Sequence, residues 1–349
     1  MNEVNDISFM RRALQLAALG GVDVAPNPMV GAVIVQNGHV IGEGYHHKYG
    51  EAHAEVHAID SVSDKSVLSQ STIYVTLEPC AHFGKTPPCA DLLIHHQFKR
   101  VVIACVDIFS EVAGRGIERL KNSGVEVVVG VLEEEARTLN KRFFCFHEKK
   151  RPFIILKWAQ TLDGFFDRLP QDRNTGVNWI TKPETKLLTH QWRSEEQAIL
   201  VGWKTIENDN SSLTVREVDG KSPHRYVLDP NCSSNPKSKV YTDGNPTTVF
   251  VRKNSFIGLS AHVEVIALDA ELNSSSVLKE IQSKNHISIF VEGGKYTLQQ
   301  LIDENLWDEA RMYVGEVMFE RGIDAPRLTN EPFLQKTIGK DQLFIYSNS

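Results

Sequence analysis

The N-terminal half contains the sequence His53-Ala54-Glu55-Val56-His57-Ala58, and two further residues able to bind a metal follow at Pro79-Cys80 and Pro88-Cys89. One imidazole and two thiolates are ligands suited to zinc, and three protein ligands leave the fourth coordination position open for water. Zinc lowers the pKa of a bound water to about 7. Each residue taken singly would more often be an ordinary core residue, but together they predict a catalytic zinc site formed by His53, Cys80 and Cys89.

Glu55 lies two residues after His53, at the start of a predicted helix. There it can reach the bound water without binding the metal, and we expect it to pass a proton to a leaving amine. Proline suits the first turn of a helix, so both cysteines are predicted at helix N-termini, where the dipole favours a thiolate. The pattern is similar to that of zinc nucleobase deaminases, with eight residues between the cysteines instead of two.

The composition is that of a globular protein. The chain has 349 residues, 38 Lys and Arg against 44 Asp and Glu, and a net charge of −6. It has no run of about 18 apolar residues, no signal-peptide pattern at its acidic N-terminus, and five scattered cysteines that form no disulfide framework. We therefore expect a soluble, cytoplasmic protein with no membrane partner, and the negative charge argues against a nucleic-acid partner.

Strands alternate with helices along both halves, which predicts two layered α/β domains. A hairpin is expected over Val30–Tyr45 because Asn37-Gly38 supplies a two-residue turn. The polar run Glu148–Pro152 ends this first series and predicts a boundary between domains 1–148 and 149–349. A second series of strands is then expected, beginning with Phe153–Trp158.

The second half has no Gly-x-Gly-x-x-Gly fingerprint, so a Rossmann dinucleotide site is not supported. It has Val291-Glu292-Gly293-Gly294 at the end of a predicted strand, followed by a helix from about Tyr296. Glycines at such a turn let backbone N–H groups approach a phosphate. Taken alone, this turn is weak evidence for a nucleotide site.

At these residues a family resemblance becomes visible. The zinc motif, with Pro26-Asn27-Pro28-Met29-Val30-Gly31 and Gly44-Tyr45-His46, resembles the bifunctional deaminase–reductases of riboflavin biosynthesis. The reductase half of that family is similar to Lys157–Gly164, Trp179–Thr181 and Leu213–Arg216. The resemblance implies a cytidine-deaminase-like α/β/α domain, a dihydrofolate-reductase-like α/β domain, one zinc per chain, and NADPH in preference to NADH.

The resemblance also implies site residues. In the deaminase half Asn27 would contact the substrate, with His46 and the loop around Lys85 as weaker candidates. The residues implied to contact NADP are Ala159, Trp179, Thr205, Asp209, Gly294, Lys295, Tyr296, Thr297, Leu298, Gln299 and Gln300. Those implied to contact the phosphoribosyl substrate are Arg193, Leu213, Arg216 and Glu292. The chain departs from the family at 108–111, at Thr161, at Val177 and at Asn210-Ser211.

The implied activity is deamination of 2,5-diamino-6-ribosylamino-4(3H)-pyrimidinone 5′-phosphate, followed by reduction of its ribosyl group to ribityl. The partners would be this small phosphorylated pyrimidine and further copies of the chain, in a homo-oligomer. One alternative is a base deaminase acting on RNA, which would need a basic groove. Another is a nucleotide-binding regulatory protein with a structural zinc, which would normally have four protein ligands.

Overall fold

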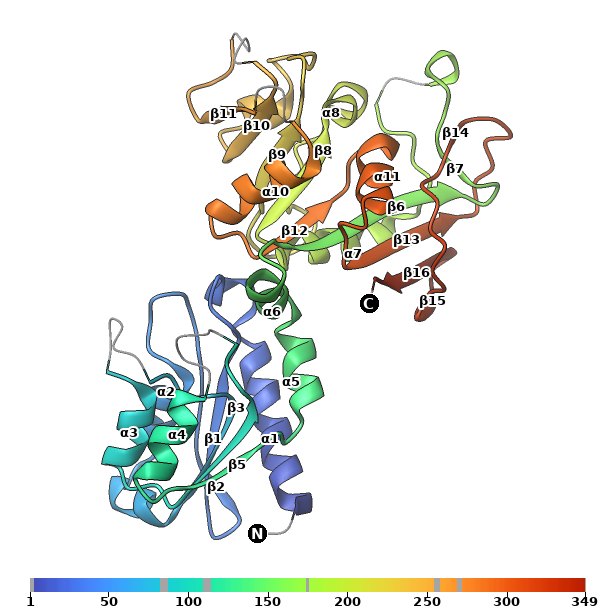
Figure 1. Ribbon diagram of the computed structural model, residues 1–349. Helices are drawn as coiled ribbons and strands as arrows, with labels where there is room; N and C mark the ends of the chain where they lie inside the picture. Colours follow the sequence, from blue (N-terminus) through green and yellow to red (C-terminus); the bar gives the residue numbers. More distant parts are fainter. Residues whose placement is uncertain are drawn as a thin grey trace. The chain divides into compact units, whose positions relative to one another are not determined.

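The computed structural model of the chain describes residues 3–81, 87–108, 114–173, 176–253, 258–268 and 272–348. It divides into two compact units, Met1–Lys150 and Arg151–Ser349 (Figure 1). Each unit has its own sheet and its own hydrophobic core. Within the described residues, no helix has the length and apolar character needed to cross a membrane.

The first unit is built on a five-stranded sheet of order β2-β1-β3-β4-β5. Its strands are β1 (Gly31–Gln36), β2 (His39–Tyr45), β3 (Thr72–Leu77), β4 (Arg100–Cys105) and β5 (Glu126–Val129). Its helices are α1 (Glu3–Ala18), α2 (Ala54–Ser61), α3 (Cys89–His95), α4 (Arg115–Asn122), α5 (Glu133–Leu139) and α6 (Lys141–Glu148), with 3₁₀ turns η1 (Gly21–Val24) and η2 (Lys65–Gln70).

The predicted α/β/α layering of this unit is confirmed. Helices α2, α3 and α4 cover one face of the sheet, and α1 and α5 cover the other (Figure 1). The hairpin turn is made by Asn37 and Gly38, both with positive φ (51° and 80°), as a type I′ turn requires. Strands β3, β4 and β5 are parallel, so their carboxyl ends lie at one edge of the sheet, where the cysteine-bearing loop leaves β3.

The second unit is built on a nine-stranded sheet of order β11-β10-β9-β8-β12-β6-β13-β16-β15. The strands are β6 (Phe153–Thr161), β8 (Ala198–Gly202), β9 (His224–Leu228), β10 (Thr247–Val251), β11 (Val263–Ala267), β12 (Ser288–Val291), β13 (Glu309–Gly315), β15 (Leu334–Ile338) and β16 (Asp341–Ser347). A small separate pair joins β7 (Phe165–Asp167) to β14 (Ile323–Asp324). The helices are α7 (Pro183–Ser194), α8 (Trp203–Asp209), α9 (Lys239–Thr242), α10 (Ser274–Ser283) and α11 (Lys295–Asp303), with η3 (Pro170–Asp172).

The seven strands from β11 to β13 run parallel, and β16 and β15 close the edge antiparallel. Parallel sheets are buried on both faces, which explains the continuous apolar runs that predicted these strands. Several elements were not predicted, among them helix α7 and the small β7–β14 pair. Helix α6, just before the proposed boundary, and the β15–β16 hairpin, at the C-terminal end, were not predicted either.

Candidate active sites

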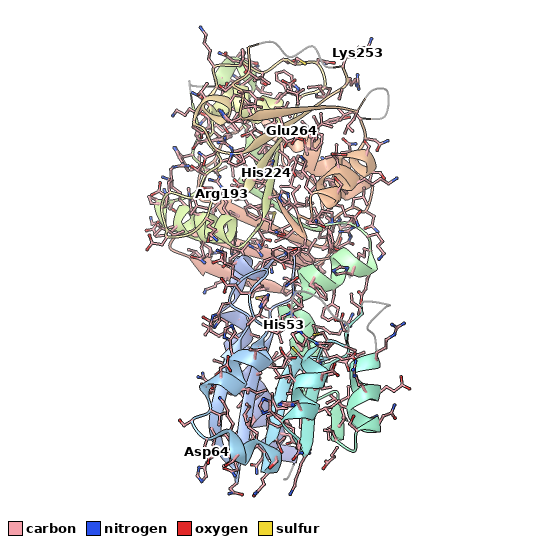
Figure 2. All side chains as sticks on the ribbon, turned by 90° about the vertical axis from the view of Figure 1, so that its left-hand side faces the viewer. His53, Asp64, Arg193, His224, Lys253 and Glu264 are labelled. Carbon is pink, nitrogen blue, oxygen red and sulfur yellow. The ribbon has the colours of Figure 1, made fainter. Side chains whose placement is uncertain are left out.

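The three predicted zinc ligands come together at the carboxyl edge of the first sheet. His53 is the N-cap residue of α2, Cys80 follows β3 by three residues, and Cys89 is the first residue of α3. Figure 2 shows His53 at the opposite end of this unit from Asp64, which caps the η2 turn. The three ligands therefore come from three separate parts of the fold: the start of α2, the segment after β3 and the start of α3.

The spacing of these ligand atoms fits a zinc ion. His53 Nδ1 lies 3.2 Å from Cys89 Sγ and 3.6 Å from Cys80 Sγ. All three ligand atoms lie within 4.8 Å of one another. A tetrahedral zinc with ordinary bond lengths would hold nitrogen and sulfur ligands about 3.6 Å apart. The residues present therefore match the donor set and the size of a zinc site with three protein ligands.

The prediction that each cysteine begins a helix is confirmed for Cys89 and wrong for Cys80. Residues 78–81 after β3 are irregular and begin no helix at Cys80, whereas a helix does begin at Cys89, after Pro88. The thiolate at Cys80 is favoured in another way, because the backbone N–H of Cys89 donates to its Sγ at 3.3 Å. The Cys89 thiol and His53 also hydrogen-bond to it and lower the pKa of Cys80 to about 4. A thiolate is the form that binds zinc.

Glu55 lies in the first turn of α2, two residues beyond His53, and its side chain is buried, with 3% of the residue exposed. Burial raises the pKa of its carboxyl to about 7, although the positive charge of His53 acts in the opposite direction. A carboxyl that titrates near neutral pH can both accept and return a proton. Glu55 lies where it was predicted, buried at the start of α2 and two residues from His53.

Asn27 is held in place by two other side chains. Its Nδ2 lies 3.2 Å from His46 Nε2, and His46 Nδ1 lies 3.0 Å from the carbonyl oxygen of Ala52. Since that carbonyl can only accept, Nδ1 carries the proton and Nε2 accepts from Asn27. Asn140 binds both the N–H and the C=O of Met29, at 2.8 and 2.9 Å, and so fixes the same segment. The Lys85 loop lies outside the described residues.

A cavity of about 520 Å³ opens at the carboxyl edge of the second sheet. Eight of the predicted contact residues line it: Ala159, Trp179, Arg193, Thr205, Asp209, Leu213, Arg216 and Glu292. Val177, a position of departure from the family, also lines it. The structure therefore brings these eight predicted residues to one place, while Gly294 to Gln300 are not part of the cavity lining.

The glycine turn lies beside this cavity. Gly293 packs against β8, and a Cβ at this position would lie 2.3 Å from the Cα of Val201, so only glycine fits. The N–H of Gly294 donates to Thr205 Oγ1 at 3.1 Å. The remaining predicted residues follow in the first turns of α11: Lys295, Tyr296, Thr297, Leu298, Gln299 and Gln300. The first N–H groups of such a helix are suited to a phosphate.

Glu292 forms the centre of a buried ion cluster in the cavity wall. Arg193, from α7 (labelled in Figure 2), donates to its two carboxylate oxygens at 2.5 and 2.9 Å. Lys157 Nζ lies 3.9 Å from the same carboxylate. Burial alone would raise the pKa of Glu292, but the charges of Arg193 and Lys157 lower it to about 2. Glu292 is therefore ionised at neutral pH.

Several cationic residues of the cavity were not predicted, Lys157 and Arg173 among them. Lys157 is the one charged residue of β6. A lysine within such an apolar strand could have indicated a functional residue. Arg173 donates to Asp167 at 2.9 Å and to Asp209 at 2.6 Å, which joins the segment after β7 to the end of α8. Because Asp209 lies 36 residues beyond Arg173, sequence spacing gave no indication of this pair.

Fold and site together define a class of protein: a zinc-binding deaminase domain followed by a reductase domain. Residues 3–105 match the zinc-binding region of cytidine and deoxycytidylate deaminases, and residues 152–338 match the RibD C-terminal domain. The chain belongs to the RibD family of riboflavin biosynthesis proteins.

Its relatives resemble it over almost the whole chain. The riboflavin biosynthesis protein RibD of Aquifex aeolicus is 40% identical, over 91% of this chain and 89% of the relative. That of Bacillus amyloliquefaciens is 37% identical, over 93% and 88%. A solved deaminase/reductase from Thermotoga maritima is 34% identical, with a TM-score of 0.90 and 99% coverage of both chains. The chain is thus a bifunctional enzyme of riboflavin biosynthesis, with zinc and NADPH as cofactors.

Proposed function

We propose that the first unit deaminates 2,5-diamino-6-ribosylamino-4(3H)-pyrimidinone 5′-phosphate and that the second reduces the ribosyl group of the product to ribityl. The observation that carries the proposal is the convergence of His53, Cys80 and Cys89 beside the buried carboxyl of Glu55. The printed name of the Thermotoga maritima relative, a diaminohydroxyphosphoribosylaminopyrimidine deaminase and 5-amino-6-(5-phosphoribosylamino)uracil reductase, supports the same pair of substrates.

In the deaminase site, His53, Cys80 and Cys89 would hold the zinc, which when bound supplies a water of pKa near 7. Glu55 would take up a proton at its carboxylate and return it to the leaving amine. Asn27 donates through Nδ2 to His46, which would leave its Oδ1 to accept from an amino group of the pyrimidine. His46 would act through Asn27 by fixing the orientation of the amide.

In the reductase site, NADPH supplies the hydride when it is bound. We assign Arg216 to the substrate phosphate, because Arg193 is already committed to Glu292 and to the carbonyl of Thr214. The nearest carboxylate oxygen to Arg216, from Glu217, is 3.7 Å away. Opening the ribosyl ring requires a proton at the ring oxygen. Lys157 in the cavity wall would supply it, because Glu292 is ionised.

The proposal assigns deamination to residues 1–148 and reduction to 149–349. It also includes assembly of the chain into a homo-oligomer in the cytoplasm, with a small phosphorylated pyrimidine and not a nucleic acid as the partner. The family models support the assignment of one reaction to each part of the chain, since the deaminase model matches 3–105 and the reductase model matches 152–338.

The test is to assay the two half-reactions separately. We expect ammonia release from the diaminopyrimidinone phosphate and none from cytidine, and NADPH oxidation only when the deaminated product is supplied. Equal ammonia release from cytidine would contradict the proposed substrate. A purified chain without zinc would contradict the assigned deaminase site.

A further inference from the structure

Glu78 is a buried carboxylate that lies between the end of β3 and Pro79-Cys80, with 4% of the residue exposed. Within the part of the chain that the structure describes, it accepts four backbone N–H groups. Oε2 accepts from Asp107 at 3.2 Å and Gly114 at 3.0 Å. Oε1 accepts from Gly116 at 2.9 Å and Ile117 at 3.2 Å. Both oxygens of the carboxylate are therefore needed to satisfy this set of donors.

Three of these donors belong to the beginning of α4. Gly114 is the N-cap residue, and Gly116 and Ile117 lie in the first turn. The first N–H groups of a helix have no partner within the helix, and the positive end of the helix dipole favours an anion. A side chain from a distant part of the sequence thus supplies the cap that α4 lacks locally, and it fastens α4 to the segment that carries Cys80.

The contact between α4 and this segment is also close in the backbone. A Cβ at Gly116 would lie 2.1 Å from the carbonyl oxygen of Pro79, so a side chain at this position would force the two backbones apart. Pro79 directly precedes the zinc ligand Cys80. The beginning of α4 therefore rests on the peptide that sets the position of Cys80.

The middle of α4 contacts residues near both cysteines. Arg119 donates to the carbonyl of Ala81 at 3.4 Å, and its Nε lies 2.6 Å from Asp91 Oδ1. Asp91 is in α3, two residues after Cys89. Helix α4 thus contacts the residues next to both cysteines, with Glu78 as the buried anchor and Arg119 as a more exposed contact.

We propose that Glu78 is a positioning residue of the deaminase: by anchoring α4 against Pro79-Cys80, it fixes Cys80 Sγ at its distance from His53 and Cys89. This inference rests on the proposed zinc site and adds a requirement to it. Glutamine in place of Glu78 would keep the shape but turn an NH₂ group toward two of the four N–H donors. Buried donors left without an acceptor are costly, so the segment should shift.

The experiment compares zinc release to a chelator from full-length wild type and Glu78→Gln. Groups that support metal ligands typically change metal affinity or activity by about 10–100-fold. We expect zinc release from Glu78→Gln to be faster by about that factor. Deamination kcat/KM should fall, while reduction of supplied product by the same preparation should be unchanged.

The matched control is Asp6→Asn. Asp6 is a second buried carboxylate of the same unit, hydrogen-bonded to Arg100 and Tyr74. Arg100 begins β4, whereas the carbonyl that binds the N–H of Glu78 belongs to Cys105 at the other end of this strand. Asp6→Asn should lower thermal stability and leave zinc release unchanged. Equal acceleration in both variants would overturn the proposal, because it would show general loosening of the unit.

A milder variant covers the case in which Glu78→Gln does not fold. Arg119→Met removes the contacts to Ala81 and Asp91 from a largely exposed side chain. It should speed zinc release in the same direction but by less. If Glu78→Gln does not fold, wild-type zinc release from Arg119→Met would overturn the proposal that α4 positions Cys80. If Glu78→Gln folds, wild-type zinc release from it would overturn the role of Glu78. Wild-type protein that binds no zinc would overturn the proposed site as well.

Discussion

Among single residues, Glu55 is expected to separate zinc binding from deamination. Glu55→Gln keeps the size of the buried side chain and removes its proton-accepting oxygen. Zinc content should stay normal, and ammonia release should fall by about 10²–10⁴-fold, the usual contribution of a general acid–base group. Elemental analysis and an ammonia assay on one preparation check both results. Ammonia release close to the wild-type rate would show that another group moves the proton.

A substitution at Cys80, unlike one at Glu55, is expected to affect zinc binding itself. Cys80→Ala removes one of three ligands and should lose the metal together with deamination. Cys232→Ala is a suitable control, because Cys232 is a partly buried cysteine of the second unit. Full zinc occupancy in Cys80→Ala, measured by elemental analysis, would remove this residue from the ligand set.

Arg216 is expected to bind the substrate phosphate in the second unit. Its side chain lines the cavity and is 48% exposed, and among the described residues its one ion-pair partner is Glu217, 3.7 Å away, so the guanidinium is available to a ligand. Loss of one charge-assisted contact costs about 1.5–3 kcal/mol. Arg216→Ala should therefore raise KM for reduction about 10- to 100-fold. The value of kcat should change much less if Arg216 binds the substrate and the transition state equally.

The control for Arg216 is Lys340→Ala, which removes a surface charge paired with Glu316 outside the cavity. Steady-state NADPH oxidation should be normal in that variant. A normal KM in Arg216→Ala would leave the phosphate to another cation of the cavity, such as Lys186.

The elements of the second unit are joined by charge as well as by apolar packing. Arg193 of α7, Lys157 of β6 and Glu292 after β12 meet in one buried cluster. Glu292 has a pKa of about 2 when folded, against 4.5 ordinarily. As the pH falls, the Glu292 carboxylate is therefore protonated in the unfolded chain before it is protonated in the folded chain. The stability due to this cluster is complete above about pH 4.5 and is lost toward pH 2, in total about 3 kcal/mol.

Tryptophan fluorescence can follow this loss in the intact chain, because all five tryptophans lie in the second unit. The free energy of unfolding should fall between pH 4.5 and 2 more steeply in wild type than in Glu292→Gln. At neutral pH the variant should be less stable by about 3–5 kcal/mol, because Arg193 is left buried and unpaired. Glu316→Gln, at an exposed pair, serves as the control. Parallel pH curves for wild type and Glu292→Gln would contradict the shifted pKa.

The elements show what the sequence could and could not predict. The hairpin predicted over Val30–Tyr45 is observed as β1 and β2, because Asn37-Gly38 between two short apolar runs is a strong local signal. Cys80 was placed at a helix start from Pro79 alone, but the N–H that serves its thiolate comes from Cys89, nine residues away. The Arg193–Glu292 pair spans 99 residues and has no local pattern at all. Features that depend on residues close in the sequence could therefore be predicted. Contacts between residues that only the fold brings together could not.

At the scale of the whole molecule, each unit contains everything that its reaction is proposed to need. The ligand cluster and Glu55 lie within Met1–Lys150, and the cavity lies within Arg151–Ser349. Each unit also has a sheet covered by its own apolar core. Units of this size with separate cores commonly fold independently. The two activities should therefore survive separation of the chain between Lys150 and Arg151.

We expect a fragment of residues 1–150 to bind one zinc and to release ammonia from the pyrimidine phosphate. A fragment of residues 151–349 should oxidise NADPH when the deaminated product is supplied, and the two fragments mixed should carry out both steps in sequence. Circular dichroism establishes that each fragment is folded before its activity is measured. A folded fragment 151–349 that fails to oxidise NADPH, while the intact chain does so, would show that the reductase site needs residues from the first unit. The corresponding result for fragment 1–150 would show the same for the zinc site, and the assignment of one complete site to each unit would then be wrong.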